Sequence, residues 1–317
     1  MSTSVGRVLS ERLRGIVPAR TVGGTGEAVE EPAYQRIVWR VLFGTTIVLS
    51  TLWVAGFYAQ DGRLFLDAHI YYRATAAWIG GGNPWTTTYQ GVPFAGLPPT
   101  LLLNLPLLPL GEAMATAFWV VANTLAIVLI VHRLHLPLWV VALHPVVEGW
   151  LGASPDLALA GVVVLGGSWF AALTKPYVAP ILLAERRWRQ IGIGLMVAIV
   201  TVPFLPWVVF YDSRQIVLET FAQFAGNPVS ASGNILLMAA VVVALISLGW
   251  RRGWLLFTPG LLAQQPHYLV FSLEAVKWSR ILALAMTIPI QHTMAIGILS
   301  YALHDRLRCA SSPRRTM

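Results

Sequence analysis

A series of apolar stretches, recurring from about residue 37 to residue 303, constrains the fold of this chain more than any other feature. No polar region between them is long enough for a separate soluble domain. A helix needs about 20 apolar residues to cross a bilayer, and backbone polar groups in lipid must find partners within the protein. The pattern predicts an all-α polytopic membrane protein with about ten transmembrane or re-entrant helices. The segments lie at roughly 37–58, 92–110, 114–131, 136–150, 156–172, 176–185, 190–210, 234–249, 254–271 and 281–303.

Composition agrees with this prediction. Of the 317 residues, 56% are hydrophobic and only 11% are charged, whereas soluble domains carry about 25% charged residues. We therefore expect one integral membrane domain at residues 36–304. A polar, basic cytoplasmic arm at 1–35 precedes it, either disordered or lying as a helix on the membrane surface, and a basic cytoplasmic tail at 305–317 follows. The single cysteine, Cys309, lies in that tail, which excludes an intramolecular disulfide.

The net charge of +8 comes from basic residues whose distribution is typical of a membrane protein and not of a nucleic-acid-binding protein. The sequence contains no nucleic-acid-binding module, and its basic residues gather in the N-terminal arm and in short polar breaks. If the N-terminus is cytoplasmic and each segment crosses the membrane once, 15 of the 22 basic residues lie inside, as the positive-inside bias favours. The seven left outside are Arg63, Arg73, Arg133, Lys175, Arg214, Lys277 and Arg280.

The loop between the first two segments, Asp61 to Pro99, contains the best candidates for chemistry. If residues 67–78 form a helix on the membrane surface, Asp67 lies at its N-terminus, where the helix dipole favours a carboxylate. The same position is typical of an ordinary helix-capping aspartate. Asp61 is the rival carboxylate, but beside a glycine and an arginine it is more typical of a solvated turn residue.

Two further features are typical of the outer membrane interface. A second long outward segment, 211–234, has apolar residues at helical spacing, which predicts an amphipathic helix ended by Gly226-Asn227-Pro228. The first loop is rich in aromatic residues, and an aromatic belt at the membrane surface is their default interpretation. These residues are Tyr71, Tyr72, Trp78, Trp85 and Tyr89.

The order of motifs in the first loop resembles that of a known enzyme family. Asp67 is followed by Tyr71-Tyr72 and by Gly82-Asn83-Pro84-Trp85, and Phe94 to Pro98 lead into a proline-containing apolar segment. This pattern is similar to the first outer loop and second helix of the C-type glycosyltransferases (GT-C fold), and closest to family 87, the polyprenol-phosphate-mannose-dependent mannosyltransferases. Weaker similarity extends over roughly residues 40–300 through Leu173-Thr174-Lys175-Pro176-Tyr177, Asn227 to Asn234, and Gln265-Pro266-His267-Tyr268.

One element departs from the family pattern. A polar glycine-containing element often precedes the lysine segment in the family, and here Gly152-Ala153-Ser154-Pro155-Asp156 stands in its place. The alternation of sides puts this element inside, whereas the resemblance favours the outside. Glu148 and Asp156, which flank the irregular segment, are therefore left out of the predicted site.

The resemblance implies a membrane glycosyltransferase of the cell envelope. Such an enzyme would move a sugar, mannose by this resemblance, from a polyprenyl-phosphate monosaccharide to a lipid or glycan acceptor at the outer face, and invert the anomeric centre. Asp67 matches the family's loop aspartate, and a carboxylate there would take the proton of the acceptor hydroxyl. Nearby cations would stabilise the leaving phosphate. The candidates are Lys175, His267, Arg280 and Arg73 for the phosphate, and Tyr71 and Tyr72 for the acceptor or sugar.

Most of these candidates also have an ordinary structural interpretation. Lys175 could extend its ammonium group to the interface, Arg280 could anchor the chain there, and His267 could be hydrogen-bonded within the bundle. His69 is expected to face away from Asp67 if the two lie on one helix.

Two other functions stay open at this stage. The chain could be a lipid or glycolipid transporter, or a catalytically inactive assembly subunit of the same fold. The sequence has no nucleotide-binding fingerprint and no metal-ligand motif, so no cofactor is predicted, and dependence on a divalent metal is left open. Membrane lipids are the expected surroundings, and no nucleic acid is expected as a partner.

Overall fold

The computed structural model describes residues 33–60, 62–224, 228–288 and 290–311. Within them the chain is almost entirely helical, with one two-stranded hairpin, so the all-α prediction is confirmed. Three predictions concern residues outside these ranges: the conformation of the basic arm up to residue 32, that of the turn at Asp61, and the helix stop at Gly226-Asn227.

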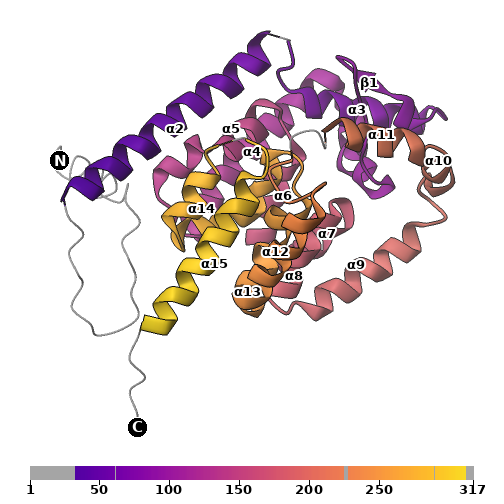
Figure 1. Cartoon of the computed structure of the whole chain (residues 1–317). Coiled ribbons are helices and arrows are strands. Elements are labelled where there is room, and N and C mark those ends of the chain that lie inside the picture. Colours follow the sequence, from indigo (N-terminus) through magenta and orange to yellow (C-terminus); the bar gives the residue numbers. More distant parts are fainter. Residues whose placement is uncertain (1–32, 61, 225–227, 289, 312–317) are drawn as a thin grey trace, which may run out of the picture.

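The elements follow one another as shown in Figure 1. The first half of the chain forms α2 (Ala33–Gln60), α3 (Leu66–Ile79), η1 (Pro84–Thr86), β1 (Thr88–Tyr89), β2 (Val92–Pro93), η2 (Pro98–Leu103), η3 (Leu105–Leu110), α4 (Glu112–Arg133), η4 (Leu138–Ala142), α5 (His144–Leu151) and α6 (Pro155–Val164). The second half forms α7 (Ser168–Thr174), η5 (Pro176–Val178), α8 (Ala179–Ala184), α9 (Trp188–Thr201), α10 (Trp207–Asp212), α11 (Arg214–Phe224), α12 (Ile235–Ser247), α13 (Trp250–Leu255), η6 (Thr258–Leu262), η7 (Pro266–Lys277), α14 (Arg280–Ala285) and α15 (Thr293–Ser311).

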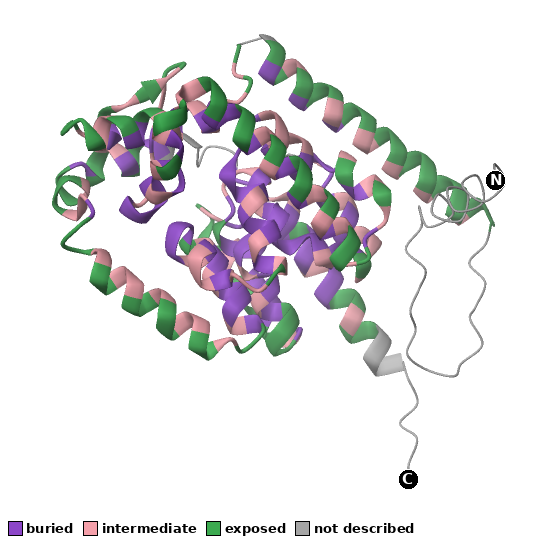
Figure 2. Ribbon diagram, turned by 180° about the vertical axis from the view of Figure 1, so that it is seen from behind, coloured by how far each residue is buried: buried purple, intermediate pink, exposed green. Residues whose placement is uncertain are grey.

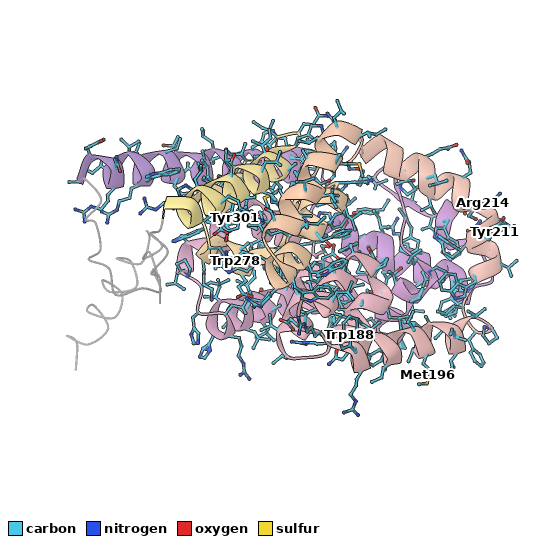
Figure 3. All side chains as sticks on the ribbon, turned by 60° about the horizontal axis from the view of Figure 1, so that its bottom comes forward. Trp188, Met196, Tyr211, Arg214, Trp278 and Tyr301 are labelled. Carbon is cyan, nitrogen blue, oxygen red and sulfur yellow. The ribbon has the colours of Figure 1, made fainter. Side chains whose placement is uncertain are left out.

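In the part of the chain that the structure describes, two helices, α2 and α4, are long and apolar enough to cross a membrane. The number rises to three if α5 and α6, which meet at a bend of 119°, count as one broken span. These helices indicate a membrane protein. Figure 2 shows that α2 and α9 are exposed along most of their length, on different sides of the helical body. Met196 of α9, which projects from the body in Figure 3, is 63% exposed, as a lipid-facing side chain would be.

The centre of the molecule is the packing of α4 against α6, with α5 and η7 beside them. A glycine makes the close approach possible, because a Cβ on Gly161 of α6 would lie 2.9 Å from the Cβ of Ala126 on α4. Small residues serve the same purpose wherever membrane helices pack closely. The fully buried Leu157, in the first turn of α6, belongs to this core. The core thereby fixes the position of the α5–α6 bend.

The first outer loop has a small core of its own. Trp85 and Phe94 are fully buried, and Trp85 Nε1 donates a hydrogen bond to the carbonyl oxygen of Gly96 at 2.9 Å. Asn83 joins this core to the second predicted outward segment, because its Nδ2 donates to Ser213 Oγ at 2.8 Å. Residues Arg214–Phe224 of this segment form the helix α11, as predicted, and the segment lies on the same side as the loop. Trp85 is a core residue, so its assignment to an aromatic belt is wrong.

The strict alternation of sides is wrong in two places. Arg73 of the outer loop pairs at 2.7 Å with Glu112, in the turn after the second predicted segment. The backbone N–H of Asp67 donates to the carbonyl oxygen of Gly152, in the break that the alternation placed inside. The second predicted segment therefore does not separate two sides. Its residues 98–110 form two 3-10 helices against α3, because four prolines interrupt the α-helical hydrogen-bond pattern.

The far end of α4 carries a different group of contacts. This helix begins beside the first loop and ends about 33 Å away. Just past that end, Lys277 Nζ donates to the carbonyl oxygen of Leu134 at 2.8 Å. Glu274, one turn before Lys277, binds Arg251 at 2.9 Å. The prediction that Lys277 shares a side with the first loop is therefore wrong, and Arg280, three residues further on, lies at the same far end.

Candidate active site

Helix α3 is docked on the α5–α6 bend by two backbone hydrogen bonds. The N–H groups of Phe65 and Asp67 donate to the carbonyl oxygens of Leu151 and Gly152, at 2.8 and 3.0 Å. Beside these bonds, Phe65 and Ala153 have φ angles of 62° and 47°. A residue with a Cβ in this left-handed region costs roughly 1–3 kcal/mol, so surrounding contacts must hold it there. The position of Asp67 is thus set by backbone contacts and not by a free loop.

Asp67 lies in the first turn of α3, close to the predicted helix start. The residue that precedes the helix as its cap is Phe65, which makes no side-chain hydrogen bond, so the capping interpretation of Asp67 is wrong. The Asp67 carboxylate instead accepts a hydrogen bond from Ser154. Ser154 Oγ also caps α6, because it accepts from the N–H of Asp156 at 3.4 Å. Ser154 therefore contacts both the Asp67 carboxylate and the backbone of Asp156.

The surroundings of Asp67 favour its protonated form. Burial raises the pKa of the Asp67 carboxyl above its ordinary value, and the negative charge of Asp156 adds to the rise. The positive charges of His267 and Lys175 and the hydrogen bond from Ser154 act in the opposite direction without cancelling it. A carboxylate with a raised pKa accepts a proton more readily near neutral pH, which is the property required of a general base.

Asp156, at the start of α6, is the centre of a buried ionic cluster. Its side chain has no exposed surface. Its Oδ1 accepts from the Tyr177 hydroxyl at 2.7 Å and lies 3.1 Å from Lys175 Nζ, and its Oδ2 lies 3.4 Å from His267 Nε2. These partners are needed because an isolated charge in a protein interior is strongly unfavourable.

His267 is held between two carboxylates. Its Nδ1 lies 3.3 Å from Glu148 Oε1, and its Nε2 faces Asp156. A carboxylate at each ring nitrogen stabilises the doubly protonated imidazolium, in which both nitrogens are donors. Glu148 lies 3.7 Å from a second histidine, His144, which hydrogen-bonds to Ser50 of α2 at 2.7 Å. The cluster therefore extends from α2 through α5 and α6 to η7.

Four of the predicted site residues lie in or beside this cluster: Asp67, Tyr71, Lys175 and His267. The Lys175 ammonium group hydrogen-bonds to the Tyr71 hydroxyl and lies 4.8 Å from the centroid of its ring. Tyr71 follows Asp67 by one helical turn, so the two share a face of α3. Lys175 is only 7% exposed. It is therefore paired inside the protein, and the interpretation that it extends to the interface is wrong.

The other three predicted residues lie elsewhere. Arg73 pairs with Glu112 on another face of α3. The Tyr72 hydroxyl donates to the carbonyl oxygen of Leu108 at 3.2 Å, which ties η3 to α3. Arg280 lies at the far end of α4, away from the loop. The structure thus gives Arg73 and Tyr72 structural partners and separates Arg280 from Asp67.

Among the cluster residues that sequence reasoning missed are two carboxylates, Glu148 and Asp156. Both flank the irregular stretch 149–155, and both are ionisable residues at the ends of apolar segments, where such residues tend to be functional. That signal was present in the sequence. The alternation of sides places the stretch away from Asp67, whereas the structure places it in contact with Asp67.

The carboxylates Glu148 and Asp156 of the cluster are paired with the cationic side chains of His267 and Lys175. Within the described part of the chain, no group of three or more histidine, cysteine, aspartate or glutamate side chains is arranged to hold a metal ion. In the cluster, the positions near the Asp156 oxygens where a cation would bind are taken by Lys175 and His267.

Comparisons with known protein families, with curated proteins and with solved structures found no match to this chain. The site is therefore interpreted from its own residues and geometry.

Proposed function

We propose that the chain is a membrane glycosyltransferase. It moves a sugar, mannose by the family resemblance, from a polyprenyl-phosphate monosaccharide to a lipid or glycan acceptor, with inversion. One observation carries this proposal: four of the seven predicted site residues come from three separate segments and meet at one buried cluster. Tyr71 and Lys175, for example, are 104 positions apart and hydrogen-bonded. Packing of apolar helices does not require such a meeting of polar side chains, whereas a reaction site does.

Asp67 is the general base in this proposal. It is only half-buried, so an acceptor hydroxyl can reach it, whereas Asp156 is fully buried and engaged by Lys175. As the acceptor oxygen bonds to the anomeric carbon, Asp67 takes the hydroxyl proton. The bond between that carbon and the phosphate oxygen breaks, and the phosphate leaves with the electron pair. Ser154 orients the carboxylate through its hydrogen bond.

Lys175 and His267 supply the positive charge for the leaving phosphate. An ammonium group has three N–H donors. Among the described residues, Asp156 and Tyr71 engage two of them, which leaves the third for a phosphate oxygen. Positive charge that is already in place, in a site from which water is largely excluded, stabilises developing negative charge strongly. Arg73 and Arg280 have no part in this site.

We place the Asp67 end at the outer face of the cell membrane and both termini in the cytoplasm. The support is the group of basic side chains at the far end of α4, where Lys277 and Arg251 lie, together with Arg306, which donates to the carbonyl oxygen of Ser247 beside α13. In this arrangement α2 and α4 cross the membrane. The shorter segments of the predicted ten are tilted, broken or re-entrant helices within the bundle.

Sugar transfer by the purified chain tests the proposal. Proteoliposomes would contain radiolabelled polyprenyl-phosphate mannose and a lipid extract as acceptor. The native chain is compared with Asp67→Asn and with Asp212→Asn, which removes an exposed carboxylate from α10 on the same side of the molecule. Transfer by the native chain and by Asp212→Asn, and its loss in a folded Asp67→Asn, is the expected result.

Three other results would contradict the proposal in different ways. Equal transfer by all three proteins would remove Asp67 from the mechanism. Movement of intact donor across the bilayer, with no new glycosidic bond, would identify a transporter. Donor binding without transfer or transport, by a native chain that restores transfer only when mixed with a second subunit, would identify an assembly subunit.

A further inference from the structure

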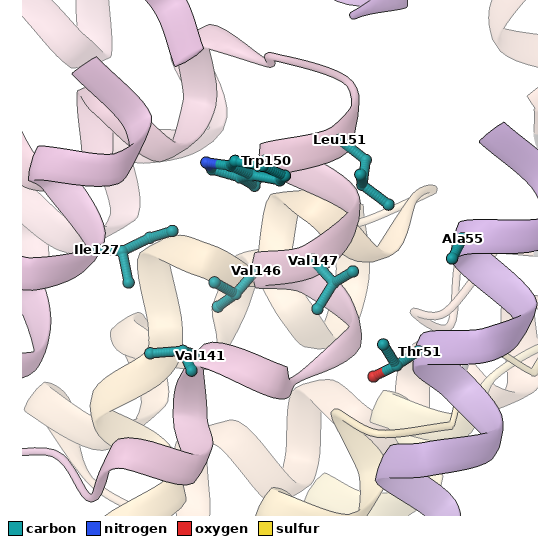
Figure 4. A pocket seen from close by; sticks show the side chains of 8 residues that line it. All are labelled: Thr51, Ala55, Ile127, Val141, Val146, Val147, Trp150 and Leu151. Carbon is teal, nitrogen blue, oxygen red and sulfur yellow. The ribbon is translucent and has the colours of Figure 1, made fainter. Parts of the chain in front are cut away.

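An apolar groove lies between α2 and the helical body, with α5 between its walls (Figure 4). Its volume is about 310 Å³, at the lower end of the range for small-molecule sites. Because α2 and α4 both cross the membrane in the proposed arrangement, the groove beside them faces lipid. The residues that line it include Thr51 and Ala55 of α2, Ile127 of α4, and Val147 and Leu151 of α5.

The groove offers its occupant carbon atoms and few hydrogen-bonding groups. Thr51 Oγ1 donates to the carbonyl oxygen of Ala142 at 3.4 Å, and Trp150, also in the lining, donates from Nε1 to Thr124 Oγ1 at 3.0 Å. The polar atoms of these side chains therefore already have partners. An occupant binds here by burying apolar surface, which suits a hydrocarbon chain.

Helix α5 separates the groove from the ionic cluster. Val147 and Leu151, one turn apart, face the groove, whereas His144 and Glu148, also one turn apart, face the cluster. One short helix thus presents hydrocarbon on one side and charge on the other. A ligand with an apolar tail and a charged head matches both sides if the tail ends where α5 ends.

The groove ends beside Asp67. Leu151, at its end, accepts a hydrogen bond from the N–H of Phe65, and the next residue, Gly152, accepts one from the N–H of Asp67. Tyr58 of α2 closes over this point, because a Cβ on Gly152 would lie 3.0 Å from the Tyr58 hydroxyl oxygen. The route from the groove to the carboxylate therefore passes Tyr58 and the α5–α6 bend.

We propose that the groove binds the isoprenoid chain of the donor lipid, with the phosphate directed past Tyr58 toward Asp67. This inference rests on the proposed function and adds where the lipid part of the donor lies. The groove leads to Asp67, and this continuity favours a lipid whose reacting group lies at the end of its chain. The acyl chain of a bulk phospholipid has no reason to end at Asp67, whereas a polyprenyl-phosphate sugar carries its reacting bond at the end of its chain.

Photolabelling of the purified chain in lipid nanodiscs tests the groove directly. The probe is a farnesyl phosphate with a diazirine in its chain, and labelled residues are identified by mass spectrometry. Labels on the groove faces of α2 and α5 are expected. An excess of polyprenyl phosphate should suppress them, and the same excess of phosphatidylglycerol should not. Equal suppression by both lipids would show that the groove holds bulk lipid, and labels outside the groove would place the chain elsewhere. Either result overturns the inference.

A matched pair of tryptophan variants sharpens the test. Val147→Trp fills the groove, whereas Val128→Trp adds the same side chain to the 63% exposed position next to Ile127 on α4. We expect polyprenyl phosphate to displace the probe roughly tenfold less well in Val147→Trp, which corresponds to the loss of about two buried methylenes. Val128→Trp should behave as the native chain. An equal effect in both variants contradicts the proposal. If Val147→Trp does not fold, Ala55→Leu narrows the groove from α2.

The labelling needs no turnover, so the two proposals can fail separately. Labels suppressed specifically by polyprenyl phosphate, in a protein that transfers no sugar, would retain the groove and reject the glycosyltransferase. Transfer that depends on Asp67, with labels suppressed equally by both lipids, would retain the enzyme and reject the groove.

Discussion

Helix α3 carries two clusters of charged and aromatic residues, and they differ mainly in their exposure to water. Asp67 and Tyr71, four residues apart, face the buried cluster with Lys175. His69 and Arg73, also four residues apart, face Glu112, which both contact at 2.7 Å. Each cluster contains a carboxylate, a cation and an aromatic ring. Their spacing on the helix is the same, and only the side of the helix differs.

The difference shows that residue type alone does not identify a site on this helix. Arg73 has 44% of its side chain exposed and lies over the ring of Tyr89 at 4.6 Å, in contact with solvent. Its ion pair is weakened by water and salt. Lys175 is almost fully buried, so its charge acts at close range on whatever enters the cluster. We therefore expect chemistry on one face of α3 and a structural contact on the other.

The largest expected effect separates the two faces by activity. Asp67→Asn removes the proposed base and should lower sugar transfer by about 10²–10⁴-fold, the usual contribution of general base catalysis. Glu112→Gln, the matching change on the other face, should leave transfer within a factor of a few of the native rate. Initial rates with radiolabelled donor measure both. A comparable loss in the two variants would mean that the whole of α3 acts as one structural unit.

The second effect separates the clusters by stability. Asp156→Asn leaves Lys175 and His267 without a shared buried carboxylate and should destabilise the fold by roughly 3–5 kcal/mol, the cost of breaking a buried ion pair from one side. Replacing both partners, in Asp156→Asn/Lys175→Met, should recover much of that loss. Denaturant unfolding in detergent measures it. A double variant as unstable as the single one would show that Lys175 is not the main partner of Asp156.

These two faces also show how far sequence could lead. Alternation of residues along a helix is a local property, so the sequence correctly placed a helix near 67–78 and turned His69 away from Asp67. Helical spacing also places Arg73 on the face of His69, but the sequence could not show which face meets the cluster, since the position of the cluster depends on contacts with distant residues such as Lys175. The predicted site residues on α3 therefore come from both of its faces.

The prediction of which loops lie on which side of the membrane is wrong for a related reason. Apolar composition distinguishes a membrane segment from a soluble one, but it does not distinguish a helix that crosses from one that turns back. The proline-rich stretch 98–110 and the bend near Gly152 have the composition of spans and the geometry of interrupted helices. Counting each as a crossing moved Asp156 away from Asp67, although Ser154 connects the two. Only three-dimensional contacts could correct that count.

The pH dependence of sugar transfer should also distinguish the two faces of α3. The base must be ionised, so transfer should be lost as the pH falls through the raised pKa of Asp67, above the usual range of an aspartate. His267 holds that pKa down by its charge, so His267→Gln should move the acid limb of the profile to higher pH. His69→Gln makes the same substitution on the other face and should leave the limb in place. Measuring kcat/KM against pH tests both. An acid limb that stays fixed in His267→Gln would show that His267 does not lower the pKa of the base.

The smallest effect is expected from the exposed pair itself. Arg73→Gln removes an ion pair that water already weakens, and such pairs contribute about 0.2–1 kcal/mol. The loss should shrink further as salt is added, because screening affects exposed charges most, whereas the effect of Asp156→Asn should change little with salt. Unfolding midpoints of both variants at low and high salt measure this contrast. A large, salt-independent effect of Arg73→Gln would mean that the contact between α3 and α4 is as dehydrated as the cluster around Asp156. Exposure to water would then not distinguish the two faces of α3.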